Sequence, residues 1–160
     1  VGCVWRRLES SERHLPDIVC IAAERALQLT GETQKEAGVE RALQWLQSIW
    51  PDYGEMARDT QDRYVRLLQS SLTGTDMVWL ARIESAQQAL PFDANLQYLA
   101  GMVCLRHQLW GKAQQLLSKA ATSLRSERLR RHAWIELSEL ARSRGDSEAA
   151  QQAIHQAAQL

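Results

Sequence analysis

Cysteine and histidine side chains are the first candidates for chemistry in this 160-residue chain. Cys104 and His107 are three residues apart, a spacing that places both on one face of a helix, where they could bind a metal ion or haem. The alternative is a buried cysteine followed by a histidine near a helix C-terminus, where a positive charge suits the helix dipole. We favour this structural interpretation, and we regard His132 and His155 as surface residues. The sequence therefore predicts no cofactor.

Catalytic and nucleotide-binding motifs are missing from the sequence. It contains no GxSxG, HExxH, Walker or CxxCH pattern. The three cysteines are an odd number without CxxC spacing, which argues against a disulfide framework and favours a reducing compartment. Cys20 and Cys104 occur within apolar helical stretches and are interpreted as small buried hydrophobic residues. We expect the chain not to be an enzyme.

The net charge argues against nucleic acid and anionic membranes as partners, and the apolar pattern argues against a membrane-spanning segment. The formal net charge is zero, so neither nucleic acid nor an anionic membrane surface is an expected partner. No apolar run approaches the roughly 18 residues that span a bilayer, and no signal peptide is present. The chain begins with Val1 rather than methionine. We expect residues 1–160 to be one domain of a longer protein.

The residues are mostly good helix formers, and no period-two pattern of strands is present. Pro16, Pro51 and Pro91 separate apolar segments with helical spacing, and Gly31 is a natural residue to end the first helix. Asp76 is a suitable N-cap residue. Alternating short helices and tight turns indicate antiparallel hairpins. The sequence predicts helices over residues 16–29, 36–50, 53–71, 76–90, 94–107, 110–124, 127–143 and 147–160.

Small residues recur in the order of a tetratricopeptide unit, which has about 34 residues in two helices. In such a unit, small side chains at positions 8, 20 and 27 let the two helices approach closely. One unit begins at Ala94 and another at Arg131, 131 − 94 = 37 residues later. Residues 17–51 match in part, and residues 53–90 carry few signature residues. The small residues of the two good units are Gly101, Ala113 and Ala120, and Ser138, Ala150 and Ala157.

This pattern predicts an all-α fold, a tetratricopeptide-like α-solenoid that binds protein partners in a concave groove. Trp110 and Trp134 occupy core positions, so we expect them to pack rather than to stack on a porphyrin. An alternative is that the groove positions are merely solvated or pack on repeats outside this chain. The exposed end of a solenoid could also support a homodimer. The predicted groove residues are Tyr98, Met102, Arg106, His132, Ile135, Glu139 and Arg142.

One segment has a more specific likeness. Residues 93–117, DANLQYLAGMVCLRHQLWGKAQQLL, resemble the C-terminal part of the HemY-type proteins of proteobacterial haem biosynthesis, most closely over QLWGKA at 108–113. The segments VWRRL at 4–8 and ARIESA at 81–86 are also similar to that family. The turn over 31–37 is unusually long for it. The flavin-dependent protoporphyrinogen oxidase that shares the name has a glycine-rich fingerprint, which this sequence lacks.

The resemblance implies a protein with N-terminal membrane helices and a tetratricopeptide part on the cytoplasmic face of the bacterial inner membrane. It also implies a non-enzymatic role in late protohaem IX synthesis, with the pathway enzymes as protein partners. Two alternatives stay open. The chain could carry a porphyrin or haem in its groove or at Cys104 and His107, or it could be a self-associating structural segment.

Overall fold

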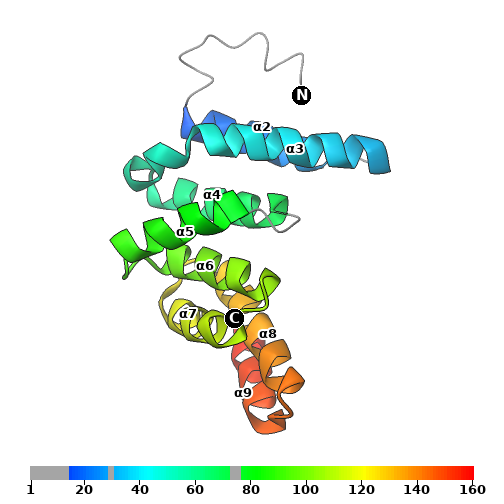
Figure 1. Ribbon diagram of the computed structural model, residues 1–160, viewed down its shortest axis with the longest axis vertical. Helices are drawn as coiled ribbons and strands as arrows, with labels where there is room; N and C mark the ends of the chain where they lie inside the picture. The colour runs from blue at the N-terminus through cyan, green and yellow to red at the C-terminus, as the bar shows by residue number, and fades with distance from the viewer. Residues whose placement is uncertain (1–14, 29–30, 73–76) are drawn as a thin grey trace. The chain divides into compact units, whose positions relative to one another are not determined.

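The computed structural model of the chain describes residues 15–28, 31–72 and 77–160. Within these residues every regular element is a helix, which confirms the predicted all-α class (Figure 1). The chain divides into two compact units, Val1–Thr73 and Gly74–Leu160, each with its own set of contacts. The single domain that the sequence predicts is not tested by this division and stays a prediction.

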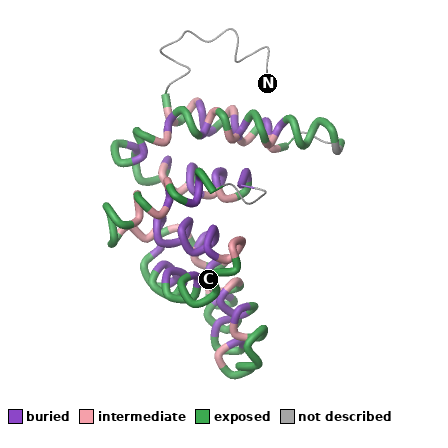
Figure 2. Tube along the Cα trace, in the orientation of Figure 1, coloured by how far each residue is buried: buried purple, intermediate pink, exposed green. Residues whose placement is uncertain are grey.

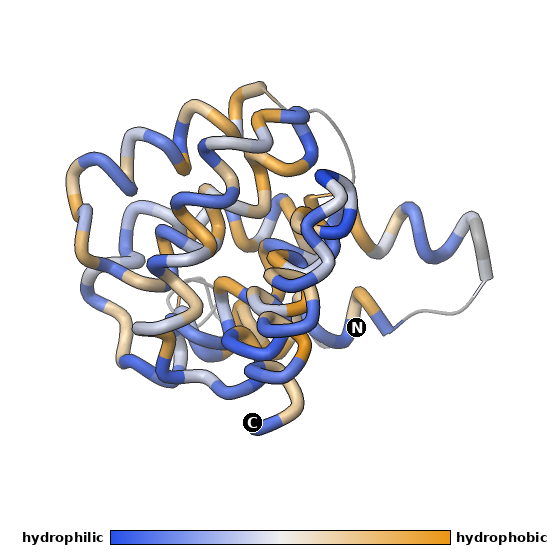
Figure 3. Tube along the Cα trace, turned by 90° about the horizontal axis from the view of Figure 1, so that it is seen from below, coloured by the Kyte–Doolittle hydropathy of each residue, from blue (hydrophilic) through white to orange (hydrophobic). Residues whose placement is uncertain are grey.

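Each helix has one face suited to burial, because apolar residues return with the helical period. Apolar and polar segments alternate along the tube in Figure 3, and buried residues repeat along the helices in Figure 2. Helix α6 (Ala94–Arg106) is buried at every residue from Asn95 to Cys104, so it lies at the centre of its unit. None of the described helices combines the length and the hydropathy that crossing a bilayer requires.

Two predicted boundaries in the first unit are wrong. The predicted helix over 36–50 begins four residues earlier, because Gly31, with φ of 94°, is the N-cap residue of the second helix instead of the end of the first. The predicted helix over 53–71 is interrupted at Met56, whose backbone is extended. The elements are α2 (Pro16–Leu27), α3 (Glu32–Ser48), the 3-10 helix η2 (Trp50–Glu55) and α4 (Arg58–Ser71).

An aromatic cluster holds the first unit together. The ring centroids of Trp50, Tyr53 and Tyr64 lie 6.0 to 6.2 Å apart. Tyr64 is fully buried and donates its hydroxyl hydrogen to the carbonyl oxygen of Leu46 at 2.8 Å. The phenol therefore buries a large apolar ring without leaving its polar atom unpaired. This arrangement fixes α4 against the C-terminal half of α3.

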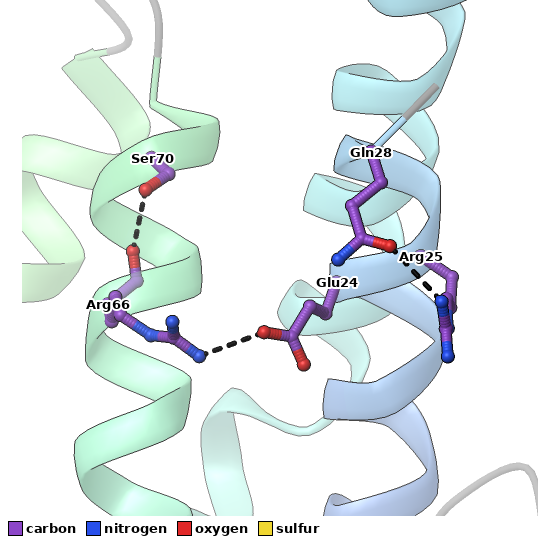
Figure 4. Close-up of polar contacts among 5 residues, drawn as sticks. All are labelled: Glu24, Arg25, Gln28, Arg66 and Ser70. Atoms are coloured by element: carbon purple, nitrogen blue, oxygen red, sulfur yellow. Dashed lines mark hydrogen bonds and ion pairs between the residues drawn. The ribbon is translucent and has the colours of Figure 1, made fainter. Parts of the chain in front are cut away.

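Polar contacts also join α2 and α4 within the first unit. Arg66 forms an ion pair with Glu24 at 3.0 Å, and Figure 4 shows the two side chains reaching across between the helices. Thr60 donates a hydrogen bond to Asp17 at 2.6 Å. The ion pair is partly exposed, and pairs of this kind contribute only about 0 to 1 kcal/mol. The ion pair and the hydrogen bond therefore set how α2 and α4 align along their lengths, and they add little to the stability of the unit.

The second unit follows the predicted helices closely. The turns between its helices contain residues typical of helix ends, with left-handed backbone at helix C-termini and aspartate caps at helix N-termini. Gly145 has φ of 76° and Gln108 has φ of 59°, so both lie in the left-handed region. Asp93 and Asp146 accept hydrogen bonds from the backbone N–H groups three residues later, each at 3.0 Å, as N-cap residues do. The helices are α5 (Met77–Ala89), α6, α7 (Trp110–Ser123), α8 (Glu127–Ser143) and α9 (Ser147–Ala158).

The small residues lie where the paired helices touch. A Cβ atom on Gly101 of α6 would be 2.7 Å from Cγ of Leu117 in α7, which is too close for any side chain. Ser138 of α8 donates a hydrogen bond to the carbonyl oxygen of Ala150 in α9 at 3.0 Å. The predicted burial of these positions is confirmed. All six residues are buried, namely Gly101, Ala113, Ala120, Ser138, Ala150 and Ala157.

Several sequence predictions fall outside the described residues. They are the segment at 4–8, the last residue of the predicted helix over 16–29 and the Asp76 cap, and the first of the three cysteines, Cys3, also lies outside. Cys20 and Cys104 are described, and both are buried as predicted.

Candidate protein-binding surface

The predicted groove residues do not share one accessible face. Tyr98 is fully buried and Met102 is only 6% exposed, because α6 is covered along most of its length. Arg106 and His132 are half-buried. The exposed members all lie on α8. They are Ile135, Glu139 and Arg142. Binding of a partner at these positions stays a prediction, and Tyr98 and Met102 are not at the surface to take part in it.

Tyr98 instead links two helices through a short polar chain. Its hydroxyl lies 2.6 Å from Nδ1 of His132 in α8, and Nε2 of that histidine lies 3.5 Å from Oε1 of Glu136. Burial raises the pKa of Tyr98, with a further contribution from Glu136, while Arg106 acts in the opposite direction. The phenol therefore stays protonated and acts as a hydrogen-bond partner, not as a nucleophile. These two contacts orient the imidazole of His132, which lies one turn of α8 before the exposed Ile135.

The sequence carries a signal for this contact that our prediction did not use. Tyr98 and His132 are 34 residues apart, three fewer than the 37-residue offset between the units that begin at Ala94 and Arg131. They therefore occupy positions 5 and 2 of the first helices of successive units. First helices of successive repeats are neighbours in a solenoid, so a complementary polar pair at nearby positions is a candidate for a contact. Glu136 then follows His132 at i+4, where two helical residues face each other.

A pocket of about 460 Å³ lies beside these residues, formed by α6, the start of α7 and α8. The indole of Trp110 is 48% exposed there, so the prediction that it packs in the core is wrong. Trp110 is the first residue of α7 and is followed by the exposed Gly111 and Lys112, so the buried face of the helix begins only at Ala113. The pocket combines apolar walls with carboxylates and a guanidinium. Its lining residues are Leu105, Trp110, Glu136, Glu139, Leu140, Ser143 and Arg144.

Cys104 and His107 do not form a prepared ligand pair. Cys104 is fully buried, and burial raises the pKa of its thiol, although Lys112 partly opposes the shift. A metal ligand must be a thiolate, and this environment disfavours one. His107 is the C-cap residue of α6, as its interpretation near a helix C-terminus predicts. Among the described residues no group of three or more histidine, cysteine or acidic side chains could hold a metal ion.

Comparison with protein-family models, with curated proteins and with solved structures gives no match to this chain. The resemblance to HemY-type proteins therefore stays a prediction. The tetratricopeptide assignment, which rests on the repeat pattern, and the haem-pathway role, which rests on the resemblance, are proposals.

Proposed function

We propose that this chain is a non-enzymatic scaffold of the tetratricopeptide type, which binds protein partners through the exposed face of α8. The observation that carries the proposal is the contact of Gly101 with Leu117, supported by the burial of the other small residues at the helix pairs. Close helix pairs of this kind stack into solenoids, whose extended surfaces bind other proteins.

The α8 surface, defined as Ile135, Glu139 and Arg142, offers mixed chemistry. Ile135 is 38% exposed, and Glu139 and Arg142 form an exposed ion pair at 2.8 Å. The adjoining pocket adds the half-exposed indole of Trp110. An exposed tryptophan and an arginine are the residue types that dominate binding energy at protein interfaces. A partner would contact the apolar pocket and exchange hydrogen bonds with the charged pair.

The partners we propose are the enzymes of late protohaem IX synthesis, and the place is the cytoplasmic face of a bacterial inner membrane. The support for both is the resemblance of residues 93–117 to HemY-type proteins.

Affinity capture with the 160-residue chain tests this function. The variant Ile135→Ala/Glu139→Ala/Arg142→Ala should recover at most about a tenth of the partner that the parent chain recovers, because these side chains form the contact surface. Gln115→Ala/Ser118→Ala/Lys119→Ala is the matched control, since it truncates three exposed residues of α7. Equal recovery by both triple variants would count against the α8 surface, provided that both have the parent's circular dichroism spectrum.

A porphyrin carrier is the second candidate, favoured by the exposed indole of Trp110 in a pocket of about 460 Å³. Clefts of roughly 300–1,000 Å³ with mostly apolar walls suit small ligands, and an indole face can stack on a macrocycle. Titration of the chain with protoporphyrin IX should then shift the Soret band at one equivalent. Trp110→Ala should abolish the shift. An unchanged Soret band would exclude the carrier and leave the scaffold.

A further inference from the structure

The pocket formed by the end of α6, the start of α7 and α8 has two carboxylates and one guanidinium in its lining. Glu136 and Glu139 of α8 supply the carboxylates, and Arg144 supplies the guanidinium. The apolar part of the lining includes Leu140 and the indole of Trp110. This combination suits a side chain with an apolar stem and a positive charge at its tip, as lysine and arginine have.

The two arginines at the C-terminal end of α8 are held by other partners. Arg144 donates a hydrogen bond from a guanidinium nitrogen to the side-chain oxygen of Gln114 in α7. Arg142 pairs with Glu139, and these two side chains are 63% and 57% exposed. Water weakens an ion pair at such an exposed site. Neither contact involves the carboxylate of Glu136.

The carboxylate of Glu136 is partly buried, and its ion-pair contact is long. Its side chain is 30% exposed, and Oε1 lies 3.5 Å from Nε2 of His132, whereas charge-assisted hydrogen bonds to carboxylates are about 2.7–2.9 Å. The other ring nitrogen of His132 is engaged by the hydroxyl of Tyr98. Arg106 attracts Glu136 electrostatically but lies outside the lining of the pocket. The carboxylate can therefore accept a shorter hydrogen bond from a cation that enters the pocket.

The indole of Trp110 offers the same cation a second attraction. It is 48% exposed and lines the pocket together with Glu136. The face of a tryptophan ring attracts an ammonium or guanidinium group within about 6 Å of its centroid, and more strongly than a tyrosine or phenylalanine ring does. The leucines of the lining, Leu105 and Leu140, would contact the methylene groups of the stem.

We propose that this pocket binds a lysine or arginine side chain of the partner protein, with its cationic group between Glu136 and Trp110. The inference rests on the proposed function, because the partner binds at the adjoining α8 surface. It adds the chemistry that the partner must present there, namely a basic side chain that projects from its own surface.

Indole N–H signals in nuclear magnetic resonance spectra test the proposal directly. The six tryptophans of the chain are labelled with ¹⁵N, and Trp110→Phe assigns the signal of Trp110 by its loss. The probe is a capped peptide with one central lysine among glycines. Titration with this peptide should shift the Trp110 signal saturably, and the same peptide with glutamate in place of lysine should leave the signal where it is.

Glu136→Gln should weaken binding of the lysine peptide about tenfold, because a hydrogen bond between two charged groups is lost. Glu127→Gln is the matched control, since it removes one carboxylate from an exposed position in the same helix, and it should leave the dissociation constant unchanged. Equal affinity of Glu136→Gln and the parent chain would overturn the proposal. Equal shifts by the two peptides, or no shift by either, would also overturn it.

Partner capture separates this inference from the proposed function. Glu136→Gln should recover markedly less partner than Glu127→Gln does. If Glu136→Gln captures the partner as well as the parent chain does, while the α8 triple variant loses it, the scaffold function stands and the basic side chain in the pocket is wrong.

Discussion

At the scale of single residues, the decisive feature is the space between paired helices. The sequence predicted which positions had to be small, and Gly101 and Ser138 are buried at the helix pairs as expected. It did not predict the exposure of Trp110, because a repeat position gives the average environment of a residue, whereas Trp110 is the first residue of α7 and precedes the buried face that begins at Ala113. The burial of Tyr98 was missed for a related reason. Its partner His132 lies on another helix, which local periodicity does not reveal.

Replacement of Gly101 by alanine should destabilise the second unit, even though alanine is the better helix former by about 1 kcal/mol. The new methyl group would meet Leu117, which is fully buried and has little room to move. Overpacking of this kind costs about 1 to 3 kcal/mol. Gly111→Ala is the control, because a methyl group there meets nothing within 4 Å, and it should be neutral or stabilising. Urea unfolding measures both, and a Gly101→Ala chain as stable as the parent would contradict the close helix contact.

Cys20 gives a prediction about pH. Burial raises the pKa of its thiol from 9.0 to about 12. The native chain therefore keeps this proton at a pH where the unfolded chain has lost it, and the protonated thiol stabilises the fold below the unfolded pKa. The free energy of unfolding should fall as pH rises from about 9 to about 12, by up to about 1.4 kcal/mol per pH unit from this group.

The variant Cys20→Ala should have a shallower fall over the same pH range, because it removes one titrating group from the unfolded chain. Chemical denaturation of both chains at several pH values gives the difference in slope. Identical slopes would show that the thiol titrates alike in both states.

At the scale of elements, the predicted helix boundaries are accurate where the sequence marks the helix ends with capping residues. In the second unit the ends carry aspartate caps and a left-handed glycine, and the predicted boundaries agree with α6 to α9 within two residues. The first turn of α3 is polar and shows no apolar residues at helical spacing. For this reason the sequence predicted Gly31 as the end of the first helix, although it is the N-cap residue of α3. The break at Met56 accompanies contacts of Tyr53 in η2 with Tyr64 and Gln61 in α4, which no local sequence pattern contains.

The cap at Asp146 can be tested directly. Its carboxylate accepts a hydrogen bond from the N–H of Ala149 at the start of α9. Asp146→Ala should lower the free energy of unfolding by about 1 kcal/mol, because that backbone donor loses its partner. Gln156→Ala, at an exposed position in the same helix, should change it by less than about 0.5 kcal/mol. Equal effects of the two variants would mean that the cap does not set the start of α9.

At the scale of the whole molecule, the all-α class of fold was predictable from the sequence, and the division of the chain into two compact units was not. Composition and helical spacing lead to an all-α chain, and the described residues are helical throughout their regular elements. The boundary between the two compact units falls in the sequence between residues 73 and 74, where a threonine–glycine pair is the only sequence signal of a change. A turn looks the same in sequence whether it joins two helices of one unit or two units.

The proposed scaffold function depends most on the binding of partner proteins at the exposed face of α8. Photo-crosslinking from single sites tests it most directly, with benzoylphenylalanine placed at Ile135 on α8 or at Gln115 on α7, both exposed positions. In cells that express the protein, position 135 should form a discrete adduct with a protein partner, and position 115 should form none. Adducts of equal yield at both positions, or none at position 135, would contradict the account.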